Sequence, residues 1–301
     1  MAKKKQIKIL ITVLVLLLAA YGLVFCTGNE EPYEESSESV AGIDLKESDI
    51  VKISYTDTEN MMSFVYKDGK WNYEKDPEFP VKQSSVEELI SELLNITANR
   101  SLEEAENASS YGLDDPSYTV TLTEENGTET EIKIGDIASN SDYYLTADDG
   151  EHVYTVNNMI PETLSFDEMQ FLKTESFPDV NNSNITALSV SQGGNSIISC
   201  SDENEDEAEQ LKDYGKELSY ITLDDCVNYH TGEDELNSYG LNESDRKIVK
   251  ASYSDNEETK NITFYLGKKF EENEVSYVYI QLKGSDMVYK IDATFVEDIY
   301  E

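Results

Sequence analysis

"SSYGLDDP" at residues 109–116 returns as "NSYGLNES" at residues 237–244, so the chain contains the motif Ser-Tyr-Gly-Leu twice in similar polar surroundings. A four-residue motif recurs easily by chance. A duplicated module, however, also repeats the residues around the motif. The sequence flanking the two copies therefore indicates whether the fold contains one module or two.

The flanking residues repeat in the same order. The matched pairs are "DIVKISY" (49–55) with "NITALSV" (184–190), "ELLNIT" (92–97) with "ELSYIT" (217–222), "IKIG" (132–135) with "FYLG" (264–267), "YYL" (143–145) with "YVY" (277–279), and "HVYTV" (152–156) with "MVYKI" (287–291). Because these pairs and the motif keep one order, we predict a tandem duplication.

Within the first copy, alternating apolar residues predict antiparallel strands, and a change of period predicts one helix. Residues 50–56 and 61–67 are expected to pair, and "DG" at 68–69 turns the chain into a further strand. The predicted helical stripe consists of Val86, Leu89, Ile90, Leu93 and Leu94. Ser85 and Glu88 have the spacing of a capping box, which predicts that the helix starts there.

The remaining strands of the first copy are expected at residues 118–123, 129–135, 142–147 and 152–156. In the second copy, the stripe of the helix consists of Leu211, Tyr214, Leu218 and Ile221. The predicted fold class is therefore α+β: two tandem modules, each an antiparallel sheet with one main helix packed on it, after an N-terminal transmembrane helix.

We interpret the repeated motif as a structural anchor of a loop. Tyr111 and Leu113 are apolar enough to pack beneath it, and Gly112 permits a backbone angle that other residues resist. The residues that follow, 114–116, turn the chain into the next strand.

The N-terminus predicts membrane attachment. Lysines at 3, 4, 5 and 8 precede an apolar run from 9 to 25, long enough to span a bilayer, and the lysines are expected to stay in the cytoplasm. An uncleaved anchor fits this run best. A signal peptide cut after Ala20-Tyr21-Gly22 and a lipoprotein modified at Cys26 are the alternatives.

This pattern divides the chain into four parts. Residues 1–26 are a membrane anchor or signal, 27–42 an acidic flexible linker, 43–178 the first module, and 179–301 the second, divergent module. The predicted location is the cell membrane, with a single span and the C-terminal region outside the cytoplasm.

Charge and motif content limit the possible functions. The net charge of −39 argues against nucleic acid and anionic lipid headgroups as partners. His152 and His230 lie in different modules and outside any metal-ligand spacing. No hydrolase, phosphate-loop or zinc-protease motif occurs in the sequence. We therefore assign no catalytic, cofactor-binding or metal-binding residue, expect no cofactor, and predict that the protein is not an enzyme.

Two weaker patterns were weighed. Asp202, Asn204, Asp206 and Asp213 fall near the ligand positions of a calcium loop, but Glu207 stands where such a loop needs glycine. Acidic residues at the start of a helix are the preferred interpretation. A disulfide between Cys200 and Cys226 also remains open.

Taken together, the basic N-terminus, "YKDGKW" (66–71), the first helix, "SSYGLDDPSYTVTL" (109–122), "IKIGD" (132–136) and the "YYL…HVYTV" ending resemble the bacterial domain-of-unknown-function family number 4340. The resemblance covers most of 43–172, and a divergent copy continues to residue 301. The second copy departs from it with Asn242-Glu243-Ser244 after the motif and with Lys268 in place of Asp136.

This resemblance implies a membrane-anchored envelope protein without an assigned activity. Some members of the family are associated with ABC-type transport systems related to gliding-motility transporters. We therefore expect a non-catalytic, membrane-tethered extracytoplasmic binding or assembly module, with a membrane protein such as an ABC transporter permease as partner. The alternatives are a solute- or cation-binding protein that uses a cleft between the modules and, third, an envelope enzyme.

Overall fold

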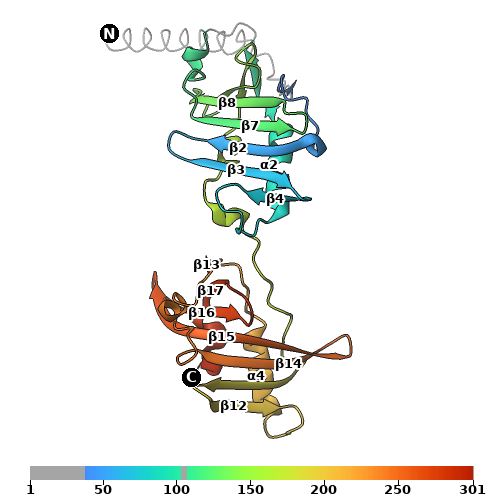
Figure 1. Cartoon of the computed structure of the whole chain (residues 1–301), viewed down its shortest axis with the longest axis vertical. Coiled ribbons are helices and arrows are strands. Elements are labelled where there is room, and N and C mark those ends of the chain that lie inside the picture. Colours follow the sequence, from blue (N-terminus) through green and yellow to red (C-terminus); the bar gives the residue numbers. More distant parts are fainter. Residues whose placement is uncertain (1–37, 103–106, 301) are drawn as a thin grey trace, which may run out of the picture. The chain divides into compact units, whose positions relative to one another are not determined.

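The computed structural model describes residues 38–102 and 107–300. These residues form an α+β protein with two large antiparallel sheets and few helices (Figure 1). The predicted fold class is confirmed at this level. Among the described residues, no helix has both the length and the apolar character needed to cross a bilayer. The predicted membrane segment, 1–26, lies outside these residues.

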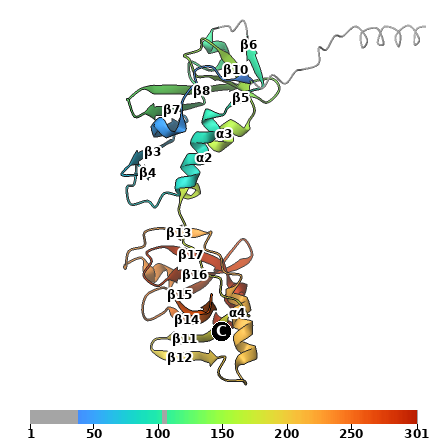
Figure 2. The same cartoon turned by 90° about the vertical axis from the view of Figure 1, so that its right-hand side faces the viewer.

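The first sheet has eight strands in the order β4-β3-β2-β7-β8-β9-β10-β6. Its strands are β2 (Ile50–Thr56), β3 (Met61–Lys67), β4 (Lys70–Tyr73), β6 (Arg100–Leu102), β7 (Tyr118–Glu124), β8 (Glu129–Ile137), β9 (Tyr143–Thr146) and β10 (Val153–Val156). The helix α2 (Gln83–Leu94) lies against one face of the sheet (Figures 1 and 2).

Several sequence predictions for this sheet are confirmed. β2 and β3 have the predicted bounds, and the turn between β3 and β4 places Asp68 and Gly69 at φ 55° and 80°. Those positive angles are what a two-residue hairpin needs. The helical stripe is buried at Val86, Leu89 and Ile90.

The predicted helix start was wrong. α2 begins at Gln83, two residues before the expected capping box, so Ser85 lies within the first turn. The side chain of Gln83 explains the earlier start. Its Oε1 accepts a hydrogen bond from the Trp71 N–H at 2.6 Å, and its Nε2 donates to the Trp71 carbonyl at 3.1 Å. These bonds fix the first residue of the helix to strand β4.

The second sheet has seven strands in the order β12-β11-β14-β15-β16-β17-β13. The strands are β11 (Ile185–Gln192), β12 (Asn195–Ser201), β13 (Cys226–Asn228), β14 (Lys247–Asp255), β15 (Glu258–Glu272), β16 (Val275–Leu282) and β17 (Val288–Asp292). The helix α4 (Ala208–Leu218) packs on β11 and β12 (Figure 2). Ile221 is buried but lies beyond the end of α4, so the predicted helix was one turn too long.

The two sheets share one strand order once β4 is set aside. Reading from β3 through β2 to β6 in the first sheet gives the same succession as reading from β12 through β11 to β13 in the second. The helices also occupy matching places in the chain. The helix α2 lies between β3 and β6, and α4 lies between the corresponding strands β12 and β13. This agreement fits the predicted duplication, which itself stays a prediction, as does the boundary at 178/179.

One predicted match between the copies was off by one residue. Leu145 pairs with Ile134, and Ile280 pairs with Leu266, so Tyr144 corresponds to Tyr279. The sequence comparison had instead placed "YYL" opposite "YVY". Tyrosine occurs at several neighbouring positions, and only the pairing of the strands fixes which of them correspond.

The chain enters each sheet in a similar way. Before the first sheet, β1 (Glu38–Ser39) pairs with β5 (Thr97–Ala98), and the Ala41 N–H donates to the Tyr154 hydroxyl at 3.1 Å. Before the second sheet, the Glu175 N–H donates to the Tyr289 hydroxyl at 2.8 Å. Residues 38–42, which the sequence assigned to the flexible linker, are thus held against the first sheet.

Candidate binding site on the open face of the second sheet

The repeated motif has one geometry in both sheets. Each copy forms a short 3₁₀ helix that ends at glycine, with φ 70° at Gly112 and 67° at Gly240. The leucine that follows is buried in both copies, and its N–H closes the turn. The tyrosine ring packs on the tyrosine of the neighbouring strand, with centroids 4.8 Å apart for Tyr111 and Tyr144.

The second copy shows the same ring pair between Tyr239 and Tyr279, with centroids 5.0 Å apart. A second glycine makes this packing possible. A Cβ at Gly135 would lie 2.2 Å from the Tyr111 carbonyl oxygen, and a Cβ at Gly267 would lie 2.2 Å from that of Tyr239. The geometry agrees with a structural role, and the motif fixes a loop to strand β8 or β15.

The other residues weighed in the sequence do not assemble into a site. His152 is exposed, and its Nδ1 lies 2.6 Å from the Asp148 Oδ2. Asp213 lies inside α4, so residues 202–213 do not form a calcium loop. Within the described ranges, no group of three or more His, Cys, Asp or Glu side chains is placed to hold a metal ion.

The two described cysteines cannot form a disulfide with each other. Cys200 is in β12 and Cys226 in β13, at opposite edges of the seven-stranded sheet. Six strand spacings separate these edges, which is roughly 29 Å, far beyond the reach of a disulfide. Both thiols are free and buried, and burial raises the pKa of Cys226 to about 11. Both thiols therefore stay protonated at neutral pH and are poor nucleophiles.

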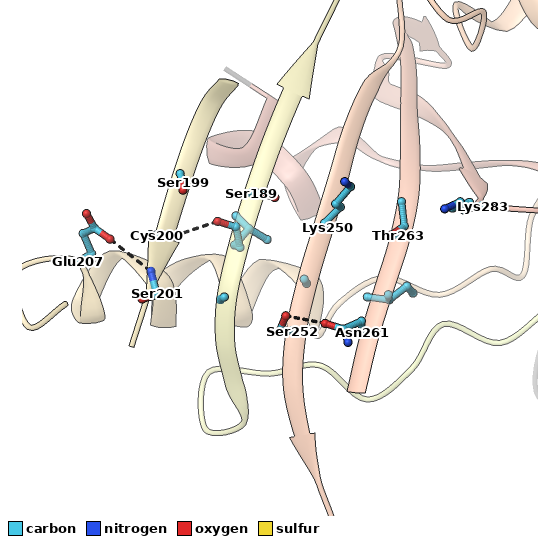
Figure 3. A pocket seen from close by; sticks show the side chains of 14 residues that line it. Ser189, Ser199, Cys200, Ser201, Glu207, Lys250, Ser252, Asn261, Thr263 and Lys283 are labelled. Carbon is cyan, nitrogen blue, oxygen red and sulfur yellow. Dashed lines mark hydrogen bonds between the residues drawn. The ribbon is translucent and has the colours of Figure 1, made fainter. Parts of the chain in front are cut away.

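A hollow on the second sheet lies on the face opposite α4. Along β11 and β14, buried side chains face the side of the sheet that carries α4, and small polar side chains alternate with them on the other face. These small residues and two lysines line a hollow of about 590 Å³ (Figure 3). The side chains labelled there on the open face are Ser189, Ser199, Ser201, Lys250, Ser252, Asn261, Thr263 and Lys283.

The floor of the hollow is made of hydrogen-bonding groups. The Ser252 hydroxyl donates to the Asn261 Oδ1 at 2.7 Å across β14 and β15. At the other side, the Ser201 N–H donates to the Glu207 carboxylate at 3.3 Å. Hydroxyl and amide groups of this kind can donate to or accept from a bound ligand.

Lys250 and Lys283 bring positive charge to the hollow, and the Glu207 carboxylate lies at its other side. In the part of the chain that the structure describes, neither ammonium group has an ion-pair partner, although the chain as a whole carries −39. Their side chains lie on the open face of β14 and just after β16 (Figure 3). An unpaired ammonium group above a polar floor favours an anionic group such as a carboxylate.

Sequence reasoning missed this site because it assigned no site residue at all. The signal was available in β14, where "KASYS" alternates small or charged residues with buried ones. The same alternation, however, describes any half-buried strand. Only the structure shows that the opposite face is left open and that, among the described residues, neither lysine has a carboxylate within ion-pair distance.

The geometry thus defines an α+β protein with two sheets and a polar, lysine-bearing hollow on one of them. The model of a protein family described as Domain of unknown function (DUF4340) matches residues 71–229, which is more than half of the chain. The chain therefore belongs to this family, and the resemblance seen in the sequence is confirmed.

The matched range differs from the one expected from the motifs. It begins in β4 and ends just after β13, so it takes in parts of both sheets. No curated protein and no solved structure matches the chain.

Proposed function

We propose that this protein is a non-catalytic, membrane-tethered binding or assembly module outside the cytoplasm. The observation that supports it is the hollow on the open face of the second sheet, with Lys250 and Lys283 above hydroxyl-bearing side chains. Such a surface suits contact with a partner better than chemistry on a substrate, because its ammonium and hydroxyl groups supply binding energy. Within the described part of the chain, none of the serine hydroxyls that line it donates to a carboxylate or a histidine, as an activated nucleophile would.

The sequence supports the tether. The basic cluster and apolar run of residues 1–26 favour an uncleaved anchor that leaves the sheets outside the cytoplasm. A domain held near a bilayer meets membrane proteins at a raised effective concentration. A transporter permease, such as that of an ABC-type system, is therefore the partner class we propose, recognised through acidic side chains that enter the hollow.

We also propose that the two sheets arose by tandem duplication. The shared strand order, the two glycine-anchored motifs and the tyrosine bonds before each sheet support this origin. Duplication leaves one copy free to keep the ancestral surface while the other changes.

Site-specific photo-crosslinking from the hollow tests the function. A photo-reactive residue at Thr263 of the full chain should give one discrete adduct in membranes, and raising the salt concentration should weaken it. The double change Lys250→Glu with Lys283→Glu should remove the adduct. The matched control is Lys260→Glu, because Lys260 lies on the same sheet but is already paired with Asp255. An adduct that survives the double change, or only a spread of random neighbours, refutes the proposal.

A further inference from the structure

Strand β12 ends the second sheet with little of the usual protection of an edge: its pairing with β11 has one irregularity, between Val190 and Ser191, and Glu207 caps one outward N–H. In the described residues, β12 pairs with β11 on one side and with no strand on the other. Its sequence, "NSIISCS", contains neither a charged residue nor proline, and Ile197 is exposed. Natural edge strands are commonly blocked by lysine, proline or a covering segment, so the part of β12 that Glu207 does not cap is a site for strand addition.

The direction of the backbone groups in β12 can be derived from its pairing. The Asp202 N–H donates to the Thr186 carbonyl at 3.0 Å, and Cys200 lies opposite Leu188 in the same ladder. Inward and outward groups alternate along an antiparallel strand. The N–H and C=O of Ser199 and Ser201 therefore point away from β11. Glu207 already accepts from the Ser201 N–H, which leaves Ser199 at the centre of the open edge.

In the first sheet, the strand that corresponds to β12 is β3, and there this edge is covered. There β3 is followed by β4, which pairs with it from Phe64 opposite Tyr73 to Lys67 opposite Lys70. Along β4, Trp71 and Tyr73 are buried, while Lys70 is exposed. A strand that covers such an edge thus carries aromatic residues on one side and polar or basic residues on the other. After β12 the chain has an acidic loop and α4 instead, and no strand of the described residues pairs with β12 in the way that β4 pairs with β3.

Charge decides between the possible occupants of this edge. The loop after β12 contains Asp202, Glu203, Glu205, Asp206 and Glu207. A second copy of the chain would bring another such loop and a net charge of −39 close to the first, which disfavours self-pairing. A basic segment would be attracted instead.

We propose that β12 is a docking site for an extended, basic segment of another protein, which adds to the sheet as a strand in the place that β4 takes in the first sheet. The added strand forms main-chain hydrogen bonds with Ser199 and packs an aromatic side chain beside the half-buried Ile198. Its basic side chains face the acidic loop. This inference rests on the proposed binding function and names a second contact of the same partner, at the rim of the hollow.

A synthetic peptide tests this site directly. The probe is the sequence of residues 69–75 with Glu74 replaced by glutamine and with blocked ends, which is a cationic copy of β4. The full chain should bind it with millimolar or tighter affinity, and binding should slow amide hydrogen exchange at Ser199. A peptide that also carries Asn72→Pro should not bind, because proline at its centre removes a main-chain donor.

Two variants of the protein complete the test. Ser199→Pro deletes an outward N–H and none of the bonds to β11, so the sheet should persist while peptide affinity falls about tenfold or more. Ser199→Ala keeps the N–H and should bind within about twofold of the original chain. Absence of binding at millimolar peptide, unchanged exchange at Ser199, or dimers of the full chain that Ser199→Pro dissociates would each overturn the proposal.

The experiments distinguish failure of strand addition at β12 from failure of the proposed binding function. If Ser199→Pro leaves the crosslinked adduct of the hollow intact while Lys250→Glu with Lys283→Glu removes it, the binding function stands and strand addition is wrong. If the peptide slows amide exchange at Ser199 but the crosslinked adduct never forms, strand addition stands and the proposal that the hollow binds a partner is wrong.

Discussion

The two sheets of this protein agree in their cores and differ on their surfaces. Both have the same strand succession, a glycine beneath a tyrosine carbonyl, and a tyrosine hydroxyl that receives the incoming chain. On the first sheet, however, Lys52 lies 2.8 Å from the Glu74 carboxylate, and Lys133 lies 3.2 Å from the carboxylates of both Glu131 and Asp149. On the second sheet Lys260 and Lys290 are paired as well, but among the described residues Lys250 and Lys283 have no carboxylate within ion-pair distance.

This difference separates the buried residues that the fold requires from the surface residues that are free to contact a partner. The buried positions cannot vary without disturbing the packing, so both sheets keep them. A lysine beside a carboxylate is largely neutralised, whereas a lysine without one can bind an external anion. The first sheet also covers its edge with β4, and the second leaves β12 open. On the second sheet, the face with Lys250 and Lys283 and the edge of β12 are therefore the two places for which we propose a partner.

The strongest test of the comparison is to add one methyl group to each sheet. Gly135→Ala and Gly267→Ala each place a Cβ 2.2 Å from a backbone carbonyl oxygen, which cannot move without displacing the motif. We expect each change to lower the free energy of unfolding by about 2–4 kcal/mol. Urea denaturation, followed by circular dichroism, measures the effect.

Gly232→Ala is the control for this pair, because its Cβ would meet nothing closer than 3.9 Å and its backbone is not in the left-handed region. It should change stability by less than about 0.5 kcal/mol. A severe loss from Gly267→Ala with a neutral Gly135→Ala would show that the two motifs are not equivalent.

A smaller effect is expected where the chain enters each sheet. Tyr154→Phe removes the acceptor of the Ala41 N–H, and Tyr289→Phe removes that of the Glu175 N–H. Each change should cost about 1 kcal/mol, the usual contribution of one such hydrogen bond. Amide exchange at Ala41 and Glu175 should become faster in the respective variant and only there. Unchanged exchange at both amides would mean that the tyrosines do not hold these segments.

The sequence predicted the shared core well because the signals are local. Periodicity located β2 and β3 to the residue, and the "DG" turn required the positive φ angles that it has. The errors occurred where distant residues decide the outcome. The helix starts at Gln83 because of bonds to Trp71 in another strand. The register of Tyr144 with Tyr279 follows from strand pairing, which a comparison of letters does not contain.

The candidate site was beyond sequence reasoning for a related reason. Whether Lys250 is neutralised depends on which side chains lie beside it on the neighbouring strands, and one of these strands, β11, is about 60 residues away in the chain. The open edge of β12 likewise arises because, among the described residues, the second sheet has no strand in the position that β4 takes in the first. The quoted matches between the copies skip that part of the chain, so a comparison of shared residues does not reveal it.

The smallest predicted effect concerns one glutamate position at the end of the two helices. Glu92 in α2 and Glu217 in α4 occupy matched places in "ELLNIT" and "ELSYIT", yet Glu92 is exposed and Glu217 is half-buried. The Glu217 Oε1 accepts a hydrogen bond from the Asp298 N–H at 3.0 Å, and its Oε2 is buried without a hydrogen-bond partner. Burial, with the nearby charge of Asp298 adding to it, raises the pKa of Glu217 above its ordinary value.

The sign of the pH dependence follows from that direction. A carboxyl group with a raised pKa binds its proton more tightly in the folded chain than in the unfolded chain. Its contribution to stability is therefore most favourable below the unfolded pKa. It is lost as pH rises from there through the folded pKa. Glu217→Gln removes the ionisation and keeps an oxygen to accept from the Asp298 N–H, so it should raise the melting temperature at neutral pH by about 1–2 °C. At acid pH, where the glutamate is protonated, the two chains should melt together.

Glu92→Gln is the matched control, since its side chain is in water in both the folded and unfolded states. The melting temperature of this variant should follow that of the original chain from acid to neutral pH. Thermal unfolding of the three chains across that range measures the difference. If Glu217→Gln lowers the melting temperature at neutral pH, the charged carboxylate stabilises the junction with Asp298. Burial would then not be the dominant influence on the Glu217 side chain, and ionisation would stabilise the end of α4 instead of destabilising it.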